Sequence, residues 1–162
     1  MAGEGTTIRL YLPAAEALGP AADAAPAMAT PEGAGQPILV VEDEPAVRQL
    51  VSSILMDLGY RTLVAEDAQG AIRILTGPEP IALMVSDVGL PGMNGRQLAE
   101  VARFHRPGLP VLFVTGYAEH AALRMEFLGT DMAMITKPFA FETLASKVAV
   151  MLRSCEIAQT DT

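Results

Sequence analysis

Cysteine is almost missing from this chain of 162 residues, which contains a single one, Cys155. One cysteine excludes an intramolecular disulfide and is typical of a reducing compartment such as the cytoplasm. Two histidines and one cysteine are also too few to close a zinc site without carboxylate ligands. We therefore expect a cytoplasmic protein that relies neither on a disulfide nor on a Cys/His zinc site.

Basic residues and long apolar runs are scarce as well. The chain has 11 Lys and Arg against 19 Asp and Glu, a formal net charge of -8. This balance argues against nucleic-acid binding through a broad basic face. No apolar run reaches the roughly 18 residues that a membrane span needs, and the first residues lack a signal-peptide pattern. We expect neither nucleic acid nor membrane to contact this chain.

Large apolar side chains are distributed unevenly and divide the chain into four parts. Residues 1–13 end in an alternation of apolar and polar side chains that predicts one isolated strand. Residues 14–36 are mostly Ala, Pro and Gly, which predicts a linker because such a segment buries too little to order itself. Residues 37–154 predict a packed domain, and residues 155–162 remain as a C-terminal tail.

Inside the predicted domain, short apolar runs alternate with segments of helical periodicity. The runs predict strands at 38–41, 62–65, 81–86, 110–115 and 132–136. The other segments predict helices at about 43–58, 68–75, 95–105, 118–127 and 140–153. Continuous apolar strands alternating with helices predict an α/β protein with a parallel sheet covered on both faces. Positions expected to face the core include Val47, Leu50, Val51, Ile54, Leu58, Leu98, Val101, Ala102, Phe141, Leu144, Ala145, Val148 and Leu152.

Polar residues stand where four of these strands end. The acids Glu42 and Asp43 follow the first strand, Asp87 follows the third, Thr115 ends the fourth and Lys137 follows the fifth. Right-handed crossovers bring the C-terminal ends of parallel strands to one rim. Open α/β sheets bind ligands at that rim. We therefore expect these five side chains to form one site.

The residue types at this rim are those that phosphoryl transfer requires. A carboxylate such as Asp87 can accept a phosphoryl group as an acyl phosphate. Acidic oxygens can hold Mg²⁺, which neutralises charge on the transferred group. Lys137 offers a compact positive charge, and Thr115 a hydroxyl donor, to phosphoryl oxygens. Each residue alone has a structural explanation, such as an acidic helix start or a loop cap, but their joint occurrence favours the site.

Residues 37–154 resemble the receiver domain of bacterial response regulators. The resemblance implies a flavodoxin-like (βα)5 doubly wound sandwich, with a five-stranded parallel sheet in the order 2-1-3-4-5. It is carried by four motifs: the acidic pair Glu42-Asp43, the acceptor Asp87 with Leu90-Pro91-Gly92-Met93-Asn94-Gly95, the pair Thr115-Gly116, and Lys137-Pro138-Phe139.

The resemblance also implies what this site does. Asp87 accepts a phosphoryl group from a phosphohistidine, and Thr115 and Lys137 stabilise that group. Asp43, Asp87 and the backbone carbonyl of Val88 bind Mg²⁺ or Mn²⁺ directly, while Glu42 acts through a water. The Lys-Pro peptide bond is expected to be cis. The implied partners are a histidine kinase core, in the same or another chain, or a histidine phosphotransfer protein, with a homodimer as a further possibility.

Two positions depart from the family pattern. Met134 occupies the place of an aromatic residue that usually reports phosphorylation, and Phe113-Val-Thr-Gly-Tyr117 resembles a receiver subgroup that also lacks that aromatic. We hypothesise that Tyr117 takes over part of the readout, and Met134 is a second candidate readout position. Gly89, two residues after the acceptor, places no side chain where one often tunes dephosphorylation.

The N-terminal segment carries a second resemblance. Gly3-Glu-Gly-Thr-Thr-Ile-Arg-Leu-Tyr-Leu-Pro13 is similar to the closing glycine box and last strand of a histidine-kinase ATP-binding domain. Followed by a linker and a receiver, it suggests the C-terminal piece of a hybrid histidine kinase whose catalytic core lies outside this chain. The chain itself is then a switch domain and not an enzyme, and its output is contact with a partner, feedback on the kinase or onward phosphotransfer.

Three other functions are compatible with an α/β chain of this kind. A phosphorylation-silent interaction module is the main alternative, although the complete acceptor site argues against it. A haloacid-dehalogenase-type phosphatase would need an Asp at the position of Gly89. A flavodoxin-like cofactor binder would need a phosphate-binding loop where Glu42-Asp43-Glu44 would repel phosphate. We expect His105 and His120 to be surface residues and not phosphocarriers.

Overall fold

A five-stranded parallel sheet forms the centre of the computed structural model, which describes residues 33–116 and 131–160, the last six by their backbone alone. The strand order is β2-β1-β3-β4-β5. The α/β class and the order 2-1-3-4-5 are therefore confirmed. The strands are β1 (Pro37–Val41), β2 (Arg61–Ala65), β3 (Leu83–Asp87), β4 (Val111–Thr115) and β5 (Met132–Thr136).

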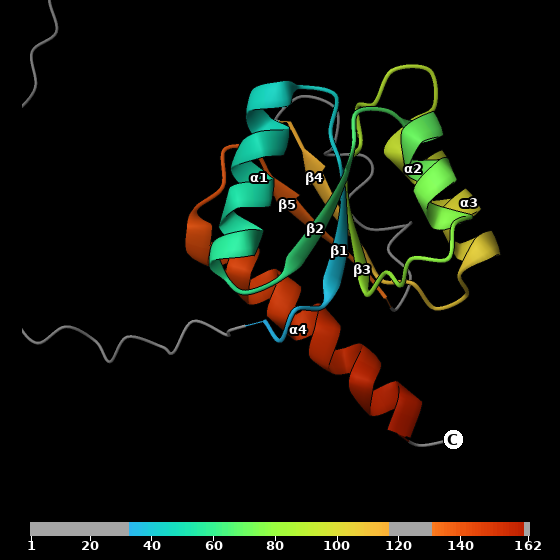
Figure 1. Cartoon of the computed structure of the whole chain (residues 1–162). Helices are drawn as coiled ribbons and strands as arrows, with labels where there is room; N and C mark the ends of the chain where they lie inside the picture. The colour runs from blue at the N-terminus through green and yellow to red at the C-terminus, as the bar shows by residue number, and fades with distance from the viewer. Residues whose placement is uncertain (1–32, 117–130, 161–162) are drawn as a thin grey trace, which may run out of the picture.

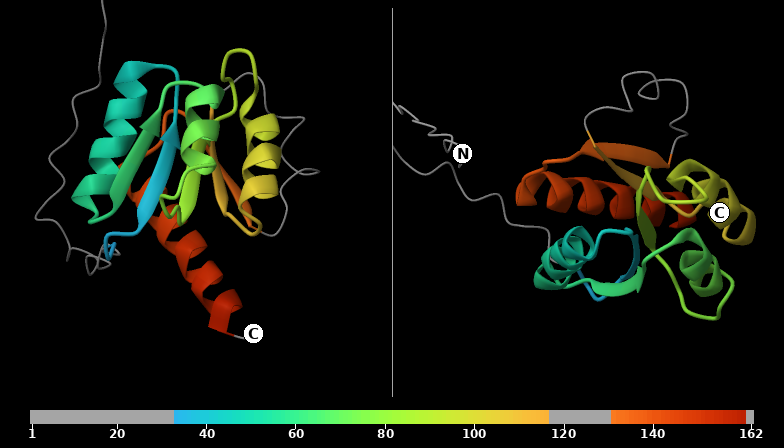
Figure 2. Two further views of the ribbon diagram at one scale, coloured as in Figure 1. Left: turned by 45° about the vertical axis from the view of Figure 1, so that its right-hand side comes forward. Right: turned by 90° about the horizontal axis from the view of Figure 1, so that it is seen from above.

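Helices cover both faces of the sheet (Figure 1). Those of the described ranges are α1 (Pro45–Asp57), α2 (Ala68–Leu75), α3 (Gly95–His105) and α4 (Phe141–Thr160). The pairs α1/α4 and α2/α3 lie on opposite faces, as the view from above shows (Figure 2). The helix predicted at 118–127 lies outside the described residues, as does the strand predicted within 1–13. Within the described ranges, no helix is both long and apolar enough to cross a bilayer.

The core consists of two clusters, one on each side of the sheet. Ile38 and Val40 of β1 point into the cluster under α1 and α4, whereas Leu39 and Val41 point into the cluster under α2 and α3. Successive side chains of a strand face opposite sides, so a strand buried on both sides must be apolar throughout. The continuous apolar runs of the sequence have this origin.

The helices α1 and α3 begin at local sequence signals. Their first residues fix the ends of the loops that contain the site residues. The Asn94 side chain accepts a hydrogen bond from the Gln97 amide at 2.9 Å, and the Gln97 side chain accepts one from the Asn94 amide at 3.2 Å. This capping box starts α3 directly after the loop that follows β3. In α1, Pro45 occupies the first turn, where its missing N–H costs nothing.

Some expectations about the helices were wrong. Leu50 is 55% exposed and Phe141 36% exposed, although both were expected in the core, and Val101 is only half-buried. Leu50 lies about 100° around α1 from Val51, at the flank of the buried stripe. Phe141 is the first residue of α4, and the buried positions of that helix begin one turn later. The helix also runs seven residues past its predicted end at 153 into the predicted tail, which contains neither Gly nor Pro to stop it.

Candidate functional site

The ends of β1, β3 and β5 bring Glu42, Asp87 and Lys137 into direct contact. The Lys137 Nζ atom lies 2.7 Å from Glu42 Oε2 and 3.0 Å from Asp87 Oδ2. Ninety-five residues separate Lys137 from Glu42, so only the parallel topology explains their contact. The rim that the sequence predicts is thus assembled around one ammonium group.

Three carboxylates form a cluster at this rim. Oxygen atoms of Glu42, Asp43 and Asp87 all lie within 4.8 Å of one another. Glu42 is buried, Asp43 is exposed and Asp87 is half-buried, so solvent reaches one side of the cluster. A compact set of oxygen ligands with an open side suits Mg²⁺ or Mn²⁺, which keep several water ligands. The donor set therefore fits such an ion.

Burial and hydrogen bonding shift the pKa values of Glu42 and Lys137. Burial raises the pKa of the Glu42 carboxyl above its usual range; the Lys137 hydrogen bond opposes this shift and the nearby Asp87 carboxylate adds to it. Burial alone would lower the pKa of Lys137, but the hydrogen bonds to Glu42 and Asp87 outweigh it and raise that pKa. These two hydrogen bonds thus favour the charged form of Lys137, and the cluster contains one more carboxylate, Asp43, to which Lys137 makes no hydrogen bond in the described part of the chain.

Asp87 is held by its own loop. The Gly89 amide donates to Asp87 Oδ1 at 3.1 Å, and the buried Ser86 hydroxyl donates to the Asp87 carbonyl at 2.9 Å. The Val88 carbonyl accepts a hydrogen bond from the Gly95 amide at 3.0 Å. A carbonyl oxygen has a second lone pair, so this bond leaves Val88 able to serve as the backbone ligand that the family resemblance implies.

The start of α3 packs against the acceptor strand so closely that only glycine fits at Gly95. A Cβ atom there would lie 2.1 Å from the Asp87 carbonyl oxygen. We expect Gly95→Ala to lower the free energy of unfolding by about 3 kcal/mol, because backbone must move to relieve the overlap. The melting temperature would fall by roughly 10 °C. Gly116→Ala is the matched control, since no heavy atom of residues 33–116 and 131–160 lies within 4 Å of its Cβ position. Equal melting temperatures for the two variants would contradict the overlap.

Thr115 and Pro138 border the site from β4 and the loop after β5. Thr115 is fully buried, its carbonyl accepts from the Lys137 amide at 2.7 Å, and its hydroxyl donates to the Gly116 carbonyl at 3.3 Å. That hydroxyl makes no hydrogen bond to Asp87 in the described part of the chain. The Lys137-Pro138 peptide bond is cis, as predicted.

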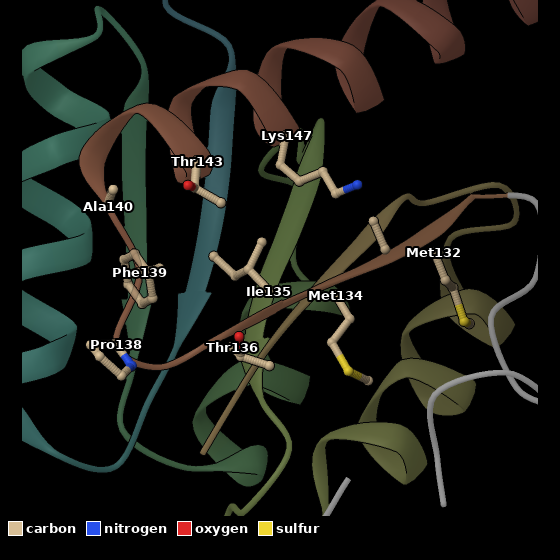
Figure 3. Close-up of a pocket in the computed structure, with 10 residues that line it drawn as sticks. Met132, Met134, Ile135, Thr136, Pro138, Phe139, Ala140, Thr143 and Lys147 are labelled. Atoms are coloured by element: carbon tan, nitrogen blue, oxygen red, sulfur yellow. The ribbon is translucent and has the colours of Figure 1, made fainter. Parts of the chain in front are cut away.

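The expected readout positions are only partly visible. Tyr117 lies outside the described residues, as does His120, while His105 is exposed as expected. Met134 is half-buried and lines an open groove of about 660 Å³ between β5 and α4. In Figure 3, Met134 points away from α4, whereas Lys147 extends from α4. Residues on both sides of Lys137 in the chain line this groove, and none of the three clustered acids does.

Sequence reasoning missed one residue that touches the acidic loop. Arg48, on α1, donates from Nη1 to the carbonyl oxygens of Glu42 and Asp43. A basic residue shortly after an acidic loop is a weak signal in sequence, because most such residues are solvated. The structure is needed to show that its side chain turns back onto the loop.

The structure combines a doubly wound parallel sheet with acids, a hydroxyl and a lysine at its C-terminal rim. This combination is typical of proteins that accept a phosphoryl group. Residues 38–149 match the response regulator receiver domain family. Because this match covers more than half of the chain, the chain belongs to that family. Receiver domains act in two-component systems, bind Mg²⁺ at an acidic pocket and interact with histidine kinases or phosphotransfer proteins.

Individual relatives are similar to different degrees. The chain is 35% identical over 114 residues to the response regulator protein FleR of Pseudomonas aeruginosa, covering 69% of this chain and 24% of FleR. It is 33% identical over 159 residues to the sensor kinase CckA of Brucella abortus, covering 93% of this chain and 17% of CckA. The crystal structure of the receiver domain from the hybrid histidine kinase CckA has a TM-score of 0.60 and 34% identity, covering 72% of this chain and 98% of that one. The chain thus spans about a quarter or less of the length of these two curated relatives.

Proposed function

We propose that Asp87 accepts a phosphoryl group from a phosphohistidine in a reaction that depends on Mg²⁺ or Mn²⁺. This proposal rests on the position of Lys137, whose ammonium binds Asp87 and Glu42, two of the three clustered carboxylates. A structural salt bridge needs one carboxylate for each ammonium. The additional acids, placed around a partly accessible Asp87, are explained by a divalent cation and a phosphoryl group.

The chemistry follows from the groups present. An Asp87 carboxylate oxygen attacks phosphorus, the bond from phosphorus to the donor imidazole nitrogen breaks, and the imidazole takes the electron pair and a proton. Asp43, Asp87 and the Val88 carbonyl would hold the cation, with Glu42 acting through a water. When bound, the cation neutralises charge on the phosphoryl oxygens.

Lys137 and Thr115 stabilise the product in this proposal. Lys137 already reaches Asp87 Oδ2, so its ammonium can follow the negative charge onto a phosphoryl oxygen. The Thr115 hydroxyl donates to its neighbour Gly116 at 3.3 Å, a long bond that it can exchange for a phosphoryl oxygen. The resulting movement at the ends of β4 and β5 would reach Tyr117 and Met134, which we propose as readout positions.

We further propose that the chain is the receiver segment of a hybrid histidine kinase and not itself an enzyme. Support comes from the alignment with CckA, which covers 93% of the chain. An alignment restricted to residues 37–162 could cover only about 78% of the 162 residues, so it includes most of the N-terminal segment. The donor is then the kinase core of the same protein or a histidine phosphotransfer protein in the cytoplasm.

Removal of the metal tests the proposed reaction. With phosphoramidate and Mg²⁺, we expect the intact mass of the protein to increase by one phosphoryl group, and with EDTA we expect the rate to fall by at least about a hundredfold. Restoring Mg²⁺ in excess should restore the adduct. An adduct that forms equally fast in EDTA would contradict the proposed metal dependence, and no adduct from either phosphoramidate or a phosphorylated histidine kinase would contradict the proposed acceptor function.

A further inference from the structure

Arg48 connects α1 to the acidic loop between β1 and α1. Its Nη1 atom donates to the Glu42 carbonyl at 2.6 Å and to the Asp43 carbonyl at 3.2 Å. Side chains of a helix lean toward its N-terminus, and Arg48 is the fourth residue of α1, so its side chain covers the loop that precedes the helix. One guanidinium nitrogen therefore fixes two consecutive peptide groups of this loop.

Glu42 and Asp43 differ in the hydrogen bonds that they make besides those to Arg48. The amide of Glu42 donates to the Ala65 carbonyl at 3.2 Å, and the Glu42 carboxylate binds Lys137. Asp43 is exposed, and within the described part of the chain Arg48 is the one side chain that hydrogen-bonds to it. The direction of the Asp43 side chain is set by the peptide groups on either side, and Arg48 binds both of their carbonyl oxygens. Asp43 thus depends on Arg48 more than Glu42 does.

We propose that Arg48 is a positioning residue that holds the Asp43 carboxylate in the acidic cluster and so increases the affinity of the site for Mg²⁺. This inference rests on the proposed function, because it takes the cluster to be the cation site. Partners behind the direct ligands commonly set metal affinity by fixing the orientation of those ligands. Arg48 acts here through the backbone and touches no reacting atom.

Because Arg48 is positively charged, a charge effect and a positioning effect predict opposite changes in the affinity for Mg²⁺. Removing a cation from the neighbourhood of a metal site strengthens the attraction between the carboxylates and Mg²⁺. Loss of positioning has the opposite effect, since Asp43 becomes free to leave the cluster. A neutral replacement therefore binds Mg²⁺ more tightly if Arg48 acts only as a charge, and more weakly if Arg48 positions the loop.

A titration of the unphosphorylated protein with Mg²⁺, followed by backbone amide chemical shifts at residues 42–44 and 87–89, measures this affinity without any phosphoryl donor. For Arg48→Met we expect the Kd to increase about tenfold. For Arg48→Lys we expect a smaller increase, because one ammonium nitrogen can replace the single nitrogen that makes both bonds. The matched control is Arg61→Met, which removes the same charge. Arg61 is the first residue of β2, whereas the acidic cluster lies where the strands end, so the Kd should stay unchanged. If Arg48→Met does not fold, Arg48→Gln is the neutral variant to titrate.

Kinetics provide an independent readout. The Mg²⁺ concentration for half-maximal phosphorylation by phosphoramidate should increase about tenfold in Arg48→Met. The rate at saturating Mg²⁺ should stay close to that of the wild type, because Arg48 does not touch the transferred group. If the wild type binds Mg²⁺ but Arg48→Met has an unchanged or lower Kd, the positioning role of Arg48 is overturned and the proposed function is not. Absence of Mg²⁺-dependent shifts in the wild type would instead overturn the proposed function.

Discussion

Asp87→Asn is expected to lose nearly all phosphoryl incorporation while the domain stays folded. The carboxamide has the shape of the carboxylate but lacks the anionic oxygen that attacks phosphorus. Lys137 keeps Glu42 as a partner at 2.7 Å, so its ammonium is not left unpaired. Intact mass after incubation with phosphoramidate and Mg²⁺ measures the effect, and the rate should fall by more than about a thousandfold.

The control for this variant is Asp57→Asn, because Asp57 is exposed at the end of α1. It removes the same charge and should leave both the rate and the melting temperature unchanged. Stability of Asp87→Asn should stay within about 1 kcal/mol of the wild type, since one charge leaves a crowded acidic cluster. Phosphorylation of Asp87→Asn at the wild-type rate would mean that another carboxylate is the acceptor, and Asp43 would be the first to test.

Lys137→Met is expected to change two measurements in opposite directions. The rate of phosphorylation at saturating Mg²⁺ should fall by about a hundredfold, because the donor aimed at Asp87 Oδ2 is lost. The affinity for Mg²⁺ should increase, because the ammonium no longer competes for the Glu42 and Asp87 carboxylates. Stopped reactions analysed by mass give the rate, and the amide-shift titration gives the Kd.

Lys147→Met serves as the control for charge and side-chain length, since Lys147 is exposed on α4. It should alter neither the rate nor the Mg²⁺ affinity. If Lys137→Met were phosphorylated as fast as the wild type, Lys137 would be a structural counter-ion with no part in transfer. A weaker affinity for Mg²⁺ in Lys137→Met would mean that Lys137 organises the carboxylates and does not compete with the cation.

Much of the fold could be predicted because strands buried on both faces leave a strong signal. Strand β3 begins with three apolar residues and ends in Ser86 and Asp87, and β4 is apolar up to Thr115. Parallel topology then requires Asp87 and Thr115 to share a rim. The proximity of Lys137 to Asp87 follows from the same rule. These predictions needed only the period of the apolar residues and the handedness of the crossovers.

Other features depend on tertiary packing that no local pattern encodes. Helical spacing places Leu50 beside the apolar stripe of α1, but it does not reveal how far the sheet and α4 cover that helix. Glycine at position 95 is readable as part of a loop motif, yet its steric reason is the carbonyl of Asp87, eight residues earlier. Arg48 binds two backbone carbonyls, which have no side-chain signature in the sequence.

The central claim is that the carboxylate of Asp87 carries the phosphoryl group, and chemical trapping tests it most directly. Borohydride reduces an aspartyl phosphate to homoserine, so the phosphorylated protein is reduced, digested and its peptides are sequenced by mass spectrometry. We predict homoserine at position 87, only after incubation with both the phosphoryl donor and Mg²⁺. Homoserine at Asp43 or at any other acid, with unmodified Asp87 in a fully phosphorylated sample, would contradict the assignment.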